Sequence, residues 1–174
     1  MRKHLALFVT VFVLLVMAGV IAANAGGSKT VRTLGGVVLE PNVRVFSNLR
    51  FSPGPTVISS GDTVFWMHSD DTEDPHTVTL ASPDQLVQDF GDFIGGECPA
   101  CEAAAGAALA GHFGTFPPTL VLDPDQDGQF NSPGDSLLFF HGETVSAQIN
   151  VPAGTTLYYF CAIHPWMQGT IEVK

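Results

Sequence analysis

The chain has 174 residues, of which 45% are hydrophobic, and this length suits one domain with a substantial apolar core. Seventeen acidic residues outnumber seven basic ones, so the formal net charge is −10 at pH 7. Nucleic acid and anionic lipid surfaces repel so acidic a chain, which excludes both as expected partners and leaves a basic protein partner open.

The first 25 residues have the layout of an export signal. Arg2 and Lys3 precede an apolar stretch at residues 5–23, and Ala23 and Ala25 offer the small residues of a cleavage site. The stretch is nearly long enough to span a bilayer, so an uncleaved membrane anchor remains the alternative. Both interpretations place residues 26–174 outside the cytoplasm, in the periplasm or secreted, with membrane contact only through an uncleaved N-terminal segment. Cleavage removes two cations and no acid, which leaves five cations against seventeen acids and a net charge of −12.

The rest of the chain is typical of short β-strands separated by turns. β-Branched and aromatic residues dominate six segments, at residues 43–51, 63–68, 77–80, 144–151, 156–161 and 170–173. Turn-forming residues separate them, as at residues 52–55, 60–62 and 152–154. Many short strands with such turns predict an all-β sandwich or barrel, which we expect to be one domain over residues 26–174.

Residues 83–135 differ in composition and interrupt the strand pattern. We expect an irregular or partly helical insertion here, because no second hydrophobic core is evident. The alanine-rich run at residues 102–109 predicts a short helix, although Gly106 disfavours it.

Two of the three cysteines, Cys98 and Cys101, lie close together in this insertion. In an oxidising compartment this spacing favours a disulfide that pins the insertion. A metal site that adds His112 remains the alternative. Cys161 is left over, and an unpaired thiol outside the cell is usually buried or bound to metal.

The end of the insertion is rich in aspartate. Asp123, Asp125, Asp127 and Gly128 have the spacing of positions one, three, five and six of an EF-hand calcium loop. Position twelve, normally glutamate, is glycine here, and Asp135 follows one residue later. A calcium site and an ordinary Asp/Gly-rich turn therefore both remain open.

The strongest chemical signal lies near the C-terminus. Cys161, His164 and Met167 fall within seven residues at the end of a predicted strand and in the turn that follows it. Two histidines and one cysteine in a trigonal plane, with a distant methionine, form the blue-copper arrangement. The second histidine must come from elsewhere, and His76, at the start of a predicted strand, is the best supplier. Each residue alone is more often structural, but the set indicates one type 1 copper ion.

These motifs make the chain similar to cupredoxins, most of all to plastocyanin and amicyanin. The resemblance rests on residues 43–53, on residues 61–66 and on Pro75-His76-Thr77-Val78. It also rests on residues 151–169, where the Cys-x2-His-x2-Met spacing resembles the short amicyanin loop. It covers about residues 37–82 and 137–174, which is the mature chain without its insertion. It implies a Greek-key β-sandwich that carries the insertion.

The resemblance also implies a function, the transfer of single electrons between redox protein partners. His164 would be the point of electron entry and exit, with Pro165 and Trp166 in the docking surface. Four protein ligands leave no open coordination position, so an enzyme is not expected. A module for copper storage or delivery, and an accessory redox subunit of a larger enzyme, remain as alternatives.

The loop before His76 carries further charged side chains. His68 is expected at the surface or beside the metal ligands rather than as a ligand. The acidic residues Asp70, Asp71, Glu73 and Asp74 form either a negative patch that steers a basic partner or a solvated loop without a role.

Overall fold

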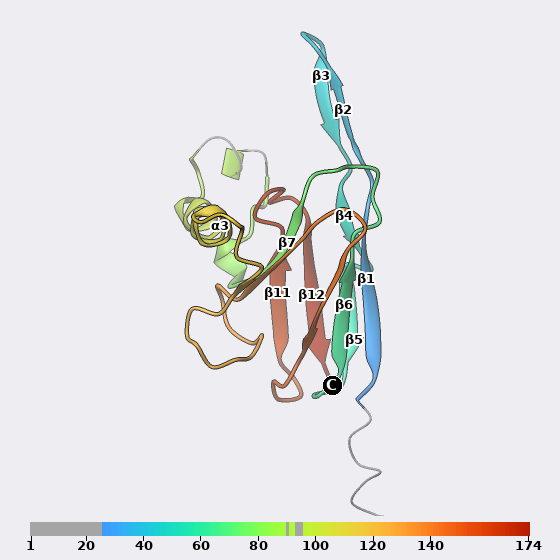
Figure 1. The fold of residues 1–174 in the computed structure, drawn as a ribbon, viewed down its shortest axis with the longest axis vertical. Helices are drawn as coiled ribbons and strands as arrows, with labels where there is room; N and C mark the ends of the chain where they lie inside the picture. Colours follow the sequence, from blue (N-terminus) through green and yellow to red (C-terminus); the bar gives the residue numbers. More distant parts are fainter. Residues whose placement is uncertain (1–25, 90, 93–95) are drawn as a thin grey trace, which may run out of the picture.

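A computed structural model describes residues 26–89, 91–92 and 96–174, and the expected export segment lies outside them. This part of the chain forms two packed β-sheets with a helix against one of them (Figure 1). Among these residues, no helix is both long enough and apolar enough to cross a membrane. The strands are β1 (Ser28–Leu34), β2 (Val37–Glu40), β3 (Arg44–Ser47), β4 (Arg50–Ser52), β5 (Pro55–Ile58), β6 (Thr63–Met67), β7 (His76–Ala81), β8 (Val121–Leu122), β9 (Ser136–Phe139), β10 (Thr144–Gln148), β11 (Thr156–Phe160) and β12 (Gln168–Val173).

The strand order confirms the predicted all-β sandwich. One sheet has the order β10-β6-β1-β4 and the other the order β5-β12-β11-β7-β9-β8. β5, β6 and β7 alternate between the sheets, and the chain crosses again from β9 to β10 and from β10 to β11. Strands far apart in sequence therefore pair, such as β7 with β11, and this pairing brings the N-terminal and C-terminal motifs together.

The core lies between the two sheets. Side chains alternate along each strand, so Val64 and Trp66 of β6 face Val78 of β7 and Tyr159 of β11 across the sandwich. The rings of Trp66 and Tyr159 meet edge to face, with centroids 5.8 Å apart. Burial of such large side chains dominates the stability of the sandwich, at about 25 cal/mol for each Å² of apolar surface removed from water.

One predicted strand is wrong. Residues 43–51 form two short strands instead, because β3 pairs only with β2 while β4 pairs with β1. The chain turns between them at Asn48, whose side chain accepts a hydrogen bond from the Gly36 backbone. The β2–β3 hairpin projects beyond the end of the sandwich, as Figure 1 shows, and exposes apolar side chains such as Leu39 and Phe46. β-Propensity alone does not reveal which partner a strand has.

The described part of the region expected to be an insertion contains the helix α3 (Pro99–Phe113), preceded by the short 3₁₀ helix η1 (Pro83–Gln85). α3 begins after Cys98, with proline at its first position, and so extends beyond the run at residues 102–109. It lies beside β7 and β11, on the side away from β1 and β6 (Figure 1). Ala108 of α3 packs with Phe160 and Ala162, so the outer face of this sheet is covered and every residue of β7 is buried.

Candidate metal centre

Three donor atoms from two distant parts of the chain meet inside one end of the sandwich. The Cys161 Sγ atom lies 3.6 Å from His76 Nδ1 and 3.8 Å from His164 Nδ1, and the two Nδ1 atoms are 3.3 Å apart. A point equidistant from these three atoms lies about 2 Å from each, the usual bond length from a first-row metal ion to an imidazole nitrogen. The three residues are no more than 7% exposed.

The two sheet partners β7 and β11 position these donors. His76 is the first residue of β7 and Cys161 directly follows β11, and the two strands pair in antiparallel register. The alternation of side chains points Cys161 into the main core, and its neighbours Phe160 and Ala162 point outward toward α3.

A tight turn brings His164 and Met167 back to the same place. The Met167 N–H donates to the His164 carbonyl over 2.8 Å, and the Cys161 N–H donates to the Met167 carbonyl over 2.9 Å. Met167 is fully buried in the same core cluster as Cys161. The turn therefore places the buried Met167 side chain in the same core cluster as Cys161, without a separate strand to carry it.

Asp70 holds His76 in one tautomer. Its Oδ2 atom lies 2.8 Å from His76 Nε2, and its Oδ1 atom accepts hydrogen bonds from the backbone N–H and the hydroxyl of Thr72. Burial opposes ionisation of Asp70, but hydrogen bonds from Thr33 and Thr72 outweigh it and lower the pKa to about 2. A carboxylate only accepts, so Nε2 carries the proton and the Nδ1 lone pair faces Cys161 and His164.

Burial shifts the pKa values of all three donor residues. Burial, together with the neighbouring His164 and His68, lowers the pKa of His76 to about 4, against the pull of Asp70. Burial also lowers the pKa of His164, so both imidazoles are neutral at pH 7. Burial raises the pKa of the Cys161 thiol, which stays protonated without metal. Metal binding would therefore release the thiol proton.

A buried chain of hydroxyl groups connects this centre to the insertion. The Thr77 N–H points at Cys161 Sγ over 3.4 Å, and the Thr77 hydroxyl accepts from the Ala162 N–H over 2.7 Å. Thr79 and Ser136 continue the chain at 3.0 and 2.7 Å, and Ser136 meets Nε2 of His112 in α3 at 2.8 Å. The sequence does not signal this contact, because it depends on which residues of β7 and β9 face outward.

One edge of the triangle reaches the surface. The His164 side chain is 8% exposed, and its Nε2 lies 3.8 Å from the carboxylate of the exposed Asp74. The Trp166 ring is 5.4 Å from the His164 ring and is 38% exposed. Asp71 and Glu73 are also exposed, so three of the four acids of this loop form an acidic rim. The inclusion of Asp70 in a surface patch was wrong, because its carboxylate is committed to His76.

His68 lies next to the triangle but outside it. Its ring is 4.7 Å from the His76 ring, and its Nε2 lies 2.9 Å from the Asp74 carbonyl. The side chain is buried, and Nδ1 is 3.8 Å from Asp70 Oδ2. His68, Asp70 and His76 thus form a second cluster of donors. This second cluster shares His76 with the triangle of His76, Cys161 and His164. Within the second cluster, Nε2 of His76 is already hydrogen-bonded to Asp70.

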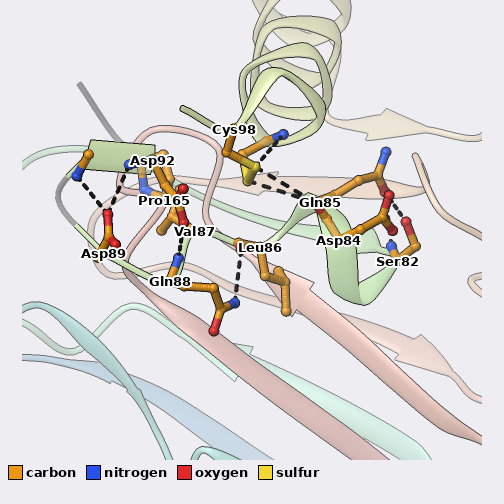
Figure 2. The surroundings of a disulfide bond; sticks show 12 residues. Ser82, Asp84, Gln85, Leu86, Val87, Gln88, Asp89, Asp92, Cys98 and Pro165 are labelled. Carbon is orange, nitrogen blue, oxygen red and sulfur yellow. Dashed lines mark hydrogen bonds between the residues drawn. A yellow bond between two sulfur atoms is a disulfide. The ribbon is translucent and has the colours of Figure 1, made fainter. Parts of the chain in front are cut away.

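The two insertion cysteines are joined to each other by a disulfide. Both sulfur atoms lie against the Asp84 carbonyl oxygen, at 3.7 and 3.9 Å, which ties the start of α3 to the segment after β7 (Figure 2). The same segment also contacts the turn that carries His164 and Met167, because Gln168 Nε2 donates to the carbonyls of Val87 and Pro165. His112 is eleven residues along the helix, about 16 Å away at 1.5 Å per residue, so a metal site that includes it and the cysteines is wrong.

The aspartate-rich loop lies apart from the triangle. Asp123, Asp125 and Asp127 each bring a carboxylate oxygen within 4.8 Å of the others. The loop ends at Asp135, whose carbonyl accepts from Leu80 near the end of β7, several residues after His76. These three acids and the copper candidates therefore form two independent clusters.

Solved structures resemble this chain, but no family model and no curated protein matches it in sequence. Among solved structures it resembles a purple cupredoxin from Nitrosopumilus maritimus (16% identity over 83% of this chain and 98% of that one, TM-score 0.42). It also resembles auracyanin A, a blue copper protein from Chloroflexus aurantiacus (18%, 85% and 100%, 0.43), and auracyanin B (16%, 87% and 91%, 0.46). Plastocyanin and amicyanin structures match at similar levels.

Proposed function

We propose that this chain is an exported carrier of single electrons, which holds one copper ion through His76, Cys161 and His164, with Met167 as a weaker fourth ligand. The observation that carries the proposal is the buried triangle of two Nδ1 atoms and one Sγ atom. One soft thiolate and two imidazoles, with a thioether nearby, form a donor set that suits copper better than calcium or magnesium.

The protein fixes the orientation of the donor side chains and shields them from water. Asp70 fixes the ring of His76, and the Thr77 N–H points at the Cys161 sulfur, so neither ligand is free to turn. When bound, copper supplies a centre that accepts and releases one electron. Four donors from a packed core leave little room for the ligands to rearrange, which favours a carrier over an enzyme.

The surface beside His164 is where we propose that electrons enter and leave. The ring edge of His164 is the exposed part of the triangle, and Trp166 and Asp74 lie next to it. The acidic rim and the overall charge of −10 favour a redox protein partner with a basic surface. The signal-like residues 1–25 support export, either with cleavage or as an anchor.

A role in copper delivery is the second candidate, and the adjoining set of His68, Asp70 and His76 is the observation that favours it. Delivery requires copper that exchanges readily and a place for it to move to. The cysteine pair of the insertion does not provide such a place while it forms a disulfide.

Visible absorption of the purified chain after addition of one equivalent of Cu(II) tests the proposal. We expect an intense thiolate-to-copper band that bleaches reversibly on reduction and is absent in Cys161→Ser. The matched control is Cys98→Ser with Cys101→Ser, which removes the other two sulfurs and should keep the band. A colourless wild-type protein, or a band that survives in Cys161→Ser, would reject the type 1 site. More than one bound copper per chain would favour delivery.

A further inference from the structure

The aspartate-rich loop between β8 and β9 has the geometry of a cation site. Asp123, Asp125 and Asp127 gather carboxylate oxygens within 4.8 Å of one another. Gly128 has a φ of +74°, which favours glycine, and its N–H donates to Asp123 Oδ2 over 2.8 Å. This hydrogen bond lowers the pKa of Asp123, so its carboxylate is charged beside two others at neutral pH.

A fourth carboxylate, that of Asp135, follows the three aspartates and has one oxygen atom without a hydrogen-bond partner. Asp135 is fully buried, and its Oδ1 atom has no hydrogen-bond partner. Its Oδ2 atom accepts the backbone N–H groups of Asn131 and Ser132, both at 2.9 Å. The Asn131 amide also reaches Asp127, and the Ser132 hydroxyl also reaches Asp125 at 3.0 Å. The Asp135 carboxylate therefore lies next to this loop and shares the Ser132 hydroxyl with Asp125, and a buried oxygen left unpaired is destabilising.

No cationic side chain lies close to this loop in the sequence. The sequence has no lysine or arginine between Arg50 and Lys174. In the described part of the chain, none of the ion pairs includes one of the four aspartates. A cation from outside the chain would offset the repulsion among the three clustered carboxylates and could pair with the buried oxygen of the fourth.

We propose that this loop binds one calcium ion through Asp123, Asp125 and Asp127, with Asp135 closing the site. Oxygen-only donors select a hard cation over copper or zinc, and acids at positions one, three and five before a glycine are the first half of a calcium loop. Asp135 stands one residue beyond position twelve, and the extra residue is accommodated within the turn at residues 131–134. The proposal is independent of the copper site.

The loop is anchored so that bound calcium would stabilise the sandwich. Phe130 enters the main core, where its ring centroid is 5.8 Å from that of Trp66. The Asp135 carbonyl accepts from the Leu80 N–H, and the Gly134 N–H donates to the Leu80 carbonyl, which ties the loop to β7. Figure 1 shows this loop, in orange, away from the projecting β2–β3 hairpin. Calcium would thus join the end of β7 to the start of β9.

Calorimetric titration and thermal melting of the full chain, first stripped with a chelator, test the site. We expect one calcium per chain and a melting temperature that rises with calcium concentration, because only the folded loop gathers the acids. Asp125→Asn with Asp127→Asn should weaken calcium binding at least tenfold. Glu97→Gln with Glu102→Gln is the matched control, since it removes two exposed acids of the same region and should bind like wild type.

Three results would overturn the site. They are no heat and no shift in melting with calcium, equal affinity in the loop variant and the control, and magnesium binding as tightly as calcium. Misfolding of the loop variant is distinguishable, because removing two repelling charges should leave its calcium-free melting temperature equal to or above that of wild type. The copper band should be the same in all three proteins, so failure of the copper site would not affect this outcome.

Discussion

At the scale of single residues, the candidate metal centre depends on Asp70, which is not itself one of the proposed ligands. Asp70 receives the His76 Nε2–H on one oxygen and two donors from Thr72 on the other. Residues that orient a metal ligand in this way typically contribute tenfold to hundredfold in affinity. Asp70, the acid of this loop that lies farthest in sequence from His76, is thus a structural part of the site.

Asp70→Asn should lower copper affinity by about 10- to 100-fold, because an amide cannot accept from both His76 and Thr72 without turning a donor toward a donor. Competition with a copper chelator measures the loss. Asp71→Asn removes the same charge from an exposed neighbour and should change the affinity little. Equal losses in the two variants would show that only the charge of the loop matters.

The buried histidines should make the copper-free protein sensitive to acid. The pKa of His76 is about 4 in the folded chain and about 6.5 when unfolded, so between these values only the unfolded chain binds the proton. The stability is complete above pH 6.5 and declines as the pH falls toward 4, by about 2 kcal/mol at pH 5 from His76 alone. The lowered pKa values of His164 and His112 act in the same direction.

Urea unfolding of the copper-free protein at several pH values measures this decline. His76→Gln should flatten the dependence between pH 6.5 and 5, because it removes the group with the assigned shift. A pH dependence that is unchanged in this variant would assign the acid sensitivity to other residues.

At the scale of elements, two glycines show opposite constraints. A Cβ atom on Gly169 of β12 would overlap the ring and hydroxyl of Tyr159, whereas one on Gly106 of α3 would meet nothing. The absence of a side chain at Gly169 allows the chain after Cys161 to pack closely against Tyr159 of β11. In the described part of the chain, nothing outside its own helix packs closely against Gly106.

Gly169→Ala should therefore destabilise the protein by about 1–3 kcal/mol through overpacking. Gly106→Ala should stabilise it by about 0.5–1 kcal/mol, since alanine favours a helix interior. Denaturant unfolding of both variants gives the two free energies. The same sign in both would contradict the packing described for β11 and β12.

The insertion helix is held at its start by the disulfide and along its length by small side chains. Because the disulfide closes a loop of only four residues, its removal should cost about 2 kcal/mol. Cys98→Ser with Cys101→Ser should therefore unfold at lower denaturant but still bind one copper. A loss of bound copper in this variant would instead tie the cysteine pair to metal handling.

At the scale of the whole molecule, the net negative charge governs how readily the protein associates with other proteins. The chain without its first 25 residues has five cations and seventeen acids, and exposed acids border the proposed electron port. Two copies of the protein therefore repel each other where the copper sites would have to meet.

Electron exchange between oxidised and reduced copies should accelerate with salt, about tenfold from low to physiological ionic strength, because screening removes this repulsion. Line broadening in spectra of mixed oxidation states measures the rate. Glu73→Gln with Asp74→Asn should reduce the salt dependence. A rate that is independent of salt would mean that the copies meet through another face.

Much of this protein was predictable from local patterns. Short strands bounded by Gly/Pro turns predict the sandwich, and the spacing of Cys161, His164 and Met167 predicts a set of soft donors. These signals are local because strands, turns and ligand loops are built from neighbouring residues. The split of residues 43–51 into two strands was not predictable, since it depends on partners supplied by other segments.

The sequence by itself determined which donors exist, the acidity of the chain and the succession of strands. The folded structure adds that His76 meets Cys161, that Asp70 is buried beside His76, and that the buried Asp135 carboxylate binds the backbone N–H groups of Asn131 and Ser132. The first of these contacts depends on pairing between strands far apart in the chain, and the other two depend on how a loop folds against the sandwich. Strand pairing is a property of the packed sandwich, which no stretch of neighbouring residues encodes alone.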